Sequence, residues 1–191
     1  MAVKTVILSD EELVELAKSG DRRSFGTLVL RYQDPVYNLA CRTIGDRNLA
    51  YDAAQDAFLR AWRSIATFKG ESKFSSWIYR ITVNCCMSQL RRRGISFDAE
   101  PPEVMETMGN PSATTEHFSR TIENQDLVEN LLKRLPPLYR TIVTLHYLQG
   151  MDCREVADIT GCPLGTVKAY LHRARALMRR LVDQWHSTRQ L

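Results

Sequence analysis

Apolar residues recur at the three- and four-residue intervals of helices along almost all of the 191-residue chain, and no stretch shows the convincing alternation of a strand. This pattern predicts an all-α fold. The expected helices of the first half cover about 9–20, 22–44, 49–66 and 75–93. Ser9 and Glu12 have capping-box spacing at the first of them, and Pro35 can kink or restart the second.

The helical pattern weakens after Gly94 and resumes at about Ile122. The segment 94–120 carries several acids and three prolines, a composition typical of a flexible linker. A loop of this length is uncommon inside one compact domain. We therefore expect two small helical domains, residues 1–93 and residues 121–191, joined by this linker.

The helix expected over 49–66 has two different sides. Its apolar side carries six residues at helical spacing, namely Tyr51, Ala54, Phe58, Ala61, Trp62 and Ile65. Asp52 and Asp56 point away from this stripe. We expect the stripe to face the core and the two carboxylates to face outward.

The stretch over 68–84 reads FKGESKFSSWIYRITVN, in which aromatic rings alternate with bases and small residues. The expected helix 75–93 begins within this stretch, and on it Ile78, Ile81 and Cys85 share a core-facing arc. A second line on this helix carries Arg80, Asn84, Met87 and Arg91, with Trp77 at its edge. Rings, an amide and cations are groups that bind single-stranded nucleic acid. Alternatively, Phe68, Phe74 and Trp77 only dock the loop on the core, as we expect for Phe74 and Trp77, and the sequence leaves both interpretations open.

From Met151 the chain has the spacing of a helix-turn-helix. Ala157 suits a close helix crossing, Gly161 a left-handed turn, and Val167 a buried anchor between the helices. The second helix places Val167, Leu171, Ala174 and Met178 in one arc, and Gly165, Lys168, Ala169, His172, Arg173 and Ala176 in the opposite arc. An ordinary helical hairpin could have a charged face too, but spacing and basic arc together favour recognition of a DNA major groove.

The net charge of +4 conceals two basic blocks, 60–93 and 165–191, which flank an acidic stretch over 94–135. Separated basic blocks suggest two contacts with a polyanion, although solvated helix faces would give the same pattern.

Several other functional classes lack a signal in the sequence. The five cysteines (41, 85, 86, 153 and 162) form no CxxC pair, and with the four scattered histidines they make no zinc motif, which favours buried free thiols. No catalytic set of nucleophile and base and no glycine-rich phosphate loop can be assigned. The chain has no apolar run of membrane-spanning length and no secretory signal, so we expect a cytoplasmic protein without membrane insertion.

Three segments in order, DAAQDAFLRAW (52–62), FKGESKFSSWIYRITVN (68–84) and TVKAYLHRAR (166–175), resemble bacterial extracytoplasmic-function (ECF) sigma factors. The resemblance covers about residues 9–183. It implies a helical bundle called sigma region 2 and a helix-turn-helix domain called sigma region 4. It also implies a non-catalytic initiation factor that needs no metal or cofactor.

The resemblance further implies three sets of contact residues. Asp52, Gln55 and Asp56 match positions that dock on the clamp helices of the polymerase β′ subunit. The positions that correspond to binding of the −10 element are Phe68, Lys69, Gly70, Lys73, Phe74, Trp77, Arg80, Asn84 and Arg91. Those that correspond to binding of the −35 element are Thr166, Lys168, Ala169, His172 and Arg173.

The partners implied by the resemblance are core RNA polymerase, whose β flap binds region 4, promoter DNA, and an anti-sigma factor. We expect a monomer when the chain is free. A rival hypothesis is a DNA-binding regulator whose N-terminal domain senses a ligand or partner. The motifs at 52–58 and 68–74 count against that rival, and an enzyme lacks a supporting residue set.

Overall fold

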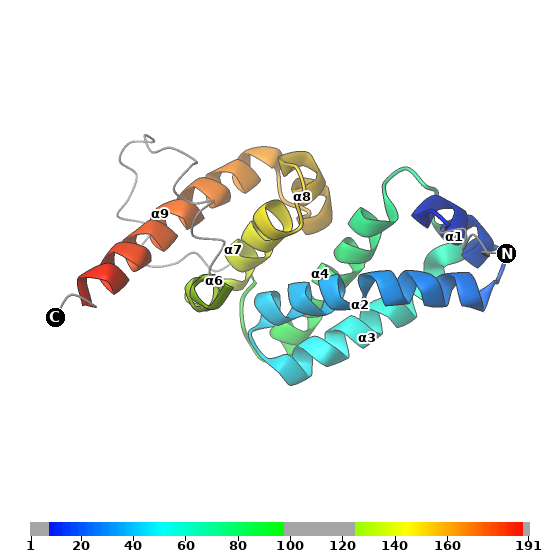
Figure 1. Cartoon of the computed structure of the whole chain (residues 1–191), viewed down its shortest axis with the longest axis horizontal. Coiled ribbons are helices and arrows are strands. Elements are labelled where there is room, and N and C mark those ends of the chain that lie inside the picture. Colours follow the sequence, from blue (N-terminus) through cyan, green and yellow to red (C-terminus); the bar gives the residue numbers. More distant parts are fainter. Residues whose placement is uncertain (1–7, 98–124, 189–191) are drawn as a thin grey trace, which may run out of the picture.

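The computed structural model describes residues 8–97 and 125–188, and within these ranges every regular element is helical, as predicted (Figure 1). The first group of helices, called the N-terminal bundle, comprises α1 (Asp10–Lys18), α2 (Arg22–Ile44), α3 (Arg47–Ser64), the short η1 (Ile65–Thr67) and α4 (Phe74–Arg92). The second, called the C-terminal group, comprises α6 (Gln125–Lys133), α7 (Pro137–Val143), η3 (Thr144–Leu148), α8 (Cys153–Thr160) and α9 (Leu164–Thr188). The linker predicted over 94–120 lies largely outside the described residues.

Side-chain caps fix the starts of the first three helices. The predicted capping box is present at α1, where Ser9 and Glu12 each bind the backbone N–H of the other. Asp21 and Asp46 accept backbone hydrogen bonds at the first turns of α2 and α3. Pro35 does not restart the helix, since α2 is one helix from Arg22 to Ile44 and Leu28, Val36 and Leu39 on either side of Pro35 pack in the core.

The N-terminal bundle packs around small residues of α3. Five alanines of this helix are buried, at positions 50, 53, 54, 57 and 61, and they let α2 and α4 approach closely. Phe58 and Trp62 pack at the border of this face, and the ring of Trp62 lies 5.0 Å from that of Phe25. The prediction for Tyr51 was wrong: its side chain is 56% exposed, because the alanines define a buried face that turns Tyr51 toward solvent.

The C-terminal group contains the predicted helix-turn-helix. Asp152 and Glu155 form a capping box at the start of α8, and Gly161 ends α8 in the left-handed conformation with φ of 73°. Val167 is fully buried, and Leu171, Ala174 and Met178 are buried with it on the inner face of α9. Before α8, the chain makes the π-helical turn η3, with Thr144 and Leu145 inside. No helix in the described part of the chain is both long and apolar enough to cross a membrane.

The two groups pack directly on each other, α7 against α2 and α8 against α4 (Figure 1). Helix α2 carries two of the polar contacts: the hydroxyls of Thr43 and Thr141 lie 3.0 Å apart in a buried position, and Arg42 binds Glu129 at 2.8 Å. The backbone N–H of Leu138 donates to the carbonyl of Phe97 at 3.2 Å. We call this packing of the two groups the closed arrangement.

The end of α2 is also part of this packing. Gly45 ends α2 with φ of 81°, and a Cβ at this position would stand 2.9 Å from Nη1 of Arg140 on α7. Arg140 therefore brings a cation to the C-terminal end of α2, where the helix dipole is negative. Burial lowers the pKa of Arg140 from its ordinary value.

Candidate nucleic-acid and polymerase interfaces

The segment Phe68 to Phe74, called the aromatic loop, joins η1 to α4 and has buried rings at both ends. Phe68 and Phe74 are buried, and Trp77 is half-buried on the first turn of α4. The ring of Trp77 lies 4.8 Å from that of Phe68 and 5.7 Å from that of Phe74. These rings pack against one another and against the core, so within this chain they hold the loop in place.

The residues between those rings face solvent. Lys69, Gly70 and Lys73 are all exposed. The aromatic loop thus presents two cations and one carboxylate, that of the exposed Glu71, on a segment whose ends are fixed. The rings at the ends of the loop therefore dock it on the core, whereas binding of nucleic acid by its exposed middle stays a prediction.

Helix α4 continues the exposed basic surface. Arg80, Asn84 and Arg91 are exposed on one line, as the helical pattern predicted. Met87, which lies on the same line, is partly buried and packs against the core. On the other side Ile78 and Cys85 are buried, whereas Ile81 is only partly buried.

A cleft of about 740 Å³ lies between α1, the aromatic loop, α4 and α8. The structure brings Lys73, Trp77 and Arg80 together on its wall. Five carboxylates also line the cleft, namely Glu11 and Glu15 of α1, Glu71 of the aromatic loop, and Glu155 and Asp158 of α8. Lys73 Nζ lies 3.6 Å from Glu155 Oε1, so an acidic side chain of the C-terminal group faces a base of the aromatic loop.

The predicted polymerase-binding residues lie on the outer side of α3, but they are not equivalent. Asp52 and Gln55 are exposed. Asp56 is partly buried and pairs with Arg60 at 2.7 Å. The hydrogen bond from Arg60, and to a lesser degree one from the Cys85 thiol, lowers the pKa of Asp56 below its usual value.

Two apolar side chains extend this outer side of α3. Tyr51 and Leu59 are 56% and 55% exposed, and they flank Gln55 at intervals of four residues. The sequence reasoning missed them, because Tyr51 was assigned to the core and Leu59 received no role. The sequence does contain a signal for these two residues. The buried face of α3 consists of alanines, so the large side chains at 51 and 59 are left on the other side.

Helix α9 presents the predicted recognition residues on its outer face. Lys168 and His172 are exposed, and Thr166 and Ala169 are partly exposed. The guanidinium carbon of Arg173 lies 5.9 Å from the centre of the Tyr170 ring, which in turn packs on Tyr139 at 4.5 Å. The aromatic pair connects this outer face of α9 to the core through α7.

Other chemistry finds little support at the described positions. Among these residues, no group of three or more histidine, cysteine or acidic side chains is placed to hold a metal ion. All five cysteines are free thiols.

A chain whose described elements are all helices, with a basic, ring-supported surface on one helical group and a helix-turn-helix on the other, is typical of a class of two-part DNA-binding proteins. Its two parts match two families of the sigma-70 class. Residues 28–95 match "Sigma-70 region 2", and residues 125–178 match "Sigma-70, region 4".

Known proteins narrow this class further. The ECF RNA polymerase sigma-E factor of Haemophilus influenzae is 34% identical over 92% of this chain and 96% of its own length. The RNA polymerase sigma-H factor of Pseudomonas aeruginosa is 33% identical over 87% of this chain and 90% of its own length. The chain belongs to the ECF sigma factors of the sigma-70 family.

Solved structures show the same fold. CnrH in complex with the cytosolic domain of CnrY is similar with a TM-score of 0.65 and 26% identity, covering 92% of this chain and 97% of that one. The sigma factor RpoE in complex with the anti-sigma factor NepR, from Bartonella quintana, has a TM-score of 0.64 and 24% identity, covering 84% and 98%. The fold of both helical groups is thus shared with sigma factors.

Proposed function

We propose that this alternative sigma factor binds core RNA polymerase and directs it to promoters with separate −10 and −35 elements. The observation that carries the proposal is the exposed basic surface of the aromatic loop and α4, supported by a row of packed rings. Membership of the sigma family supplies the setting in which such a surface meets single-stranded promoter DNA.

The N-terminal bundle has the groups needed to capture unpaired −10 bases. Lys69 and Lys73 on the loop and Arg80 and Arg91 on α4 can neutralise phosphates, and the amide of Asn84 can bind a base edge. The partly exposed ring of Trp77 can stack on a base. Binding a base that has already left the stack favours melting, since it offsets an unstacking cost of a few kcal/mol without ATP.

The outer side of α3 is proposed to bind the β′ clamp helices of core polymerase. Asp52 and Gln55 offer exposed polar contacts, and Tyr51 and Leu59 add apolar area beside them. Exposed apolar side chains between polar ones are typical of protein interfaces. Asp56 contributes less directly in this proposal, because Arg60 already binds its carboxylate.

The recognition helix α9 is proposed to read the −35 element as duplex DNA. Lys168, His172 and Arg173 lie on its outer face with Thr166 and the small Ala169, which permits close approach to a major groove. Region 4 is also proposed to bind the β flap. An anti-sigma partner is a further part of the proposal, since two similar structures are complexes, one of them with an anti-sigma factor.

Promoter-specific run-off transcription with purified core polymerase tests this function. The wild-type chain should bind core and give a discrete transcript, and Asp52→Arg should weaken core binding at least about tenfold while the melting temperature stays unchanged. Asp34→Arg, a charge reversal on an exposed position of α2, is the matched control. Specific duplex binding without any requirement for core would instead favour the rival DNA-binding regulator.

A further inference from the structure

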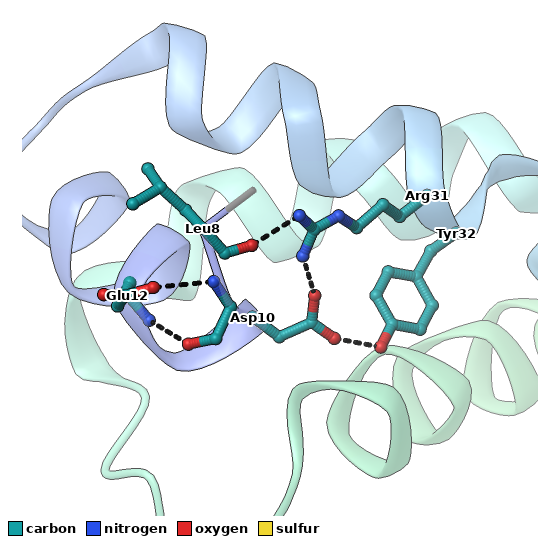
Figure 2. A network of polar contacts seen from close by, with 6 residues as sticks. Leu8, Asp10, Glu12, Arg31 and Tyr32 are labelled. Atoms are coloured by element: carbon teal, nitrogen blue, oxygen red, sulfur yellow. Dashed lines mark hydrogen bonds and ion pairs between the residues drawn. The ribbon is translucent and has the colours of Figure 1, made fainter. Parts of the chain in front are cut away.

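The start of α1 is bound to α2 through a polar network on Asp10 (Figure 2). Arg31 donates from Nη1 to Oδ1 of Asp10 at 2.6 Å and from Nη2 to the carbonyl of Leu8 at 2.5 Å. The capping box of Ser9 and Glu12 fixes the backbone between these two acceptors. The Asp10 carboxylate therefore has a defined position relative to α2.

The second oxygen of this carboxylate binds a tyrosine. The hydroxyl of Tyr32 donates to Oδ2 of Asp10, so each carboxylate oxygen accepts a bond from α2 (Figure 2). Burial, and then the Asp10 carboxylate, raise the pKa of Tyr32 well above its ordinary value. The hydroxyl is therefore protonated at neutral pH and donates to Asp10.

The ring of Tyr32 is the first of a row of rings that leads to the aromatic loop. It packs edge-on against Phe74 at 5.2 Å and against Tyr79 at 6.4 Å. Phe74 packs on Trp77, and Trp77 packs on Phe68. Phe68 and Phe74 are the two ends of the loop, so the row connects the Asp10 network to both of its ends.

Helix α1 also touches the loop region directly. It contacts η1 and α4, the elements that precede and follow the loop. Val14 of α1 lines the same cleft as Phe68 and Phe74. The exposed middle of the loop lies in neither helix, and therefore its position depends on these contacts at its ends.

We propose that Asp10 is a positioning residue for capture of the −10 element, acting through the Tyr32 hydroxyl and ring on Phe74. This inference rests on the proposed function, because it assigns α1 a role in presenting the loop that binds DNA. Asp10 does not touch DNA in this proposal, since a carboxylate would repel phosphates. Its task is to hold the ring that keeps Lys69 and Lys73 in place.

Two conservative variants and one control test the proposal. Tyr32→Phe keeps the ring and removes only the hydroxyl, and Asp10→Asn keeps the shape and removes the charge. Asp34→Asn, an exposed change of the same kind on α2, corrects for the general gain in DNA affinity when an acid is lost. Each variant is compared by amide hydrogen exchange of the free chain and by promoter opening with core polymerase.

The expected result is local. Amides of residues 69–73 should exchange about three- to tenfold faster in Tyr32→Phe and Asp10→Asn, while core amides of α2 and α3 change little. Promoter opening should fall by a similar factor, with core affinity and −35 duplex binding unchanged. The effect of the double variant should be smaller than the sum of the two single effects, because both changes act on the contact between Tyr32 and Asp10.

Two results would overturn the proposal. One is unchanged exchange at residues 69–73 in both variants. The other is faster exchange there with promoter opening equal to that of Asp34→Asn. If Asp10 had only a structural role, amide protection would instead fall throughout the chain, and binding to core polymerase and to the −35 duplex would weaken together with promoter opening. If the wild-type chain gives no transcript, the proposed function fails, and the exchange data on the free chain still decide whether Asp10 positions the loop.

Discussion

Cys85 and Cys86 are neighbours on α4, and both side chains are buried in the N-terminal bundle. Removal from water raises the pKa of the Cys85 thiol to about 12, and burial raises that of Cys86 further. The thiolate is the reactive form of cysteine. Both residues therefore stay protonated thiols in the native chain, which agrees with the sequence-based interpretation of buried free thiols for these two, whereas Cys41, Cys153 and Cys162 are only partly buried.

This burial predicts a sharp division among the five thiols. At pH 8 a thiol with a pKa of about 12 is ionised in only ~10⁻⁴ of molecules, whereas about a quarter of ordinary thiols are ionised. In the native protein Ellman's reagent should modify at most the three partly exposed cysteines, 41, 153 and 162, and all five after unfolding. Cys162→Ser should remove one accessible thiol and Cys86→Ser none. Rapid native modification at Cys85 or Cys86 would contradict the assignment.

Single positions were predictable where local geometry decides them. Gly161 at a left-handed turn and Val167 beneath it follow from spacing alone, and the structure has both. Tyr51 was misplaced because it lies near the border of an amphipathic arc. At such a border the neighbouring helix decides burial, and the periodicity of one helix does not contain that information.

At the scale of elements, the aromatic loop separates into parts with different roles. Its end rings are buried, and its middle is exposed and basic. Composition alone could not make this division, because rings that stack on bases and rings that dock a loop have the same sequence pattern. The helices themselves were predictable to within a few residues, since α2 and α4 end almost where their apolar periodicity ends.

This separation predicts opposite effects for two substitutions in one loop. Phe74→Ala should reduce the free energy of unfolding by about 3–5 kcal/mol, because it removes a buried ring from the core. Lys69→Ala should leave stability within about 0.5 kcal/mol of wild type, because its side chain is exposed. Lys69→Ala should still weaken binding of single-stranded −10 DNA. Urea unfolding and fluorescence anisotropy measure the two effects, and a stable Phe74→Ala variant would contradict the role given to this ring.

At the scale of the whole molecule, the closed arrangement contains a buried polar contact with a defined direction. The Thr141 hydroxyl donates to the carbonyl of Pro137 at 2.8 Å. A hydroxyl has one proton, so Thr43 must be the donor in its contact with Thr141. The sequence could not predict this pairing, because threonines 98 positions apart meet only when the two groups pack.

In the closed arrangement the C-terminal group contacts the proposed −10 surface but not the outer face of α9, the proposed −35 surface. Tyr79 on α4 donates to Gln149 of the C-terminal group at 2.9 Å, and Lys73 of the aromatic loop faces Glu155. The outer face of α9 remains exposed at Lys168 and His172. In this arrangement the loop side of the proposed −10 surface meets acidic groups of α8, whereas the proposed −35 surface stays open.

Glu155→Gln tests the consequence of that contact for DNA binding. A glutamine oxygen can still accept from the backbone N–H of Asp152, so the capping box of α8 is kept while the charge that faces Lys73 is lost. Affinity of the free chain for single-stranded −10 DNA should rise about two- to fivefold at low salt, the range of an exposed ion pair, and the gain should shrink as salt screens it.

Asp158→Asn removes a charge from the same helix and cleft, and should give a smaller gain than Glu155→Gln. The decisive comparison repeats Glu155→Gln in a chain that also carries Lys73→Ala. If Glu155 acts by occupying Lys73, Glu155→Gln should add little once Lys73 is gone. An equal gain with and without Lys73 would mean that only the general charge of the cleft matters, and that the contact between α8 and the loop does not compete with DNA.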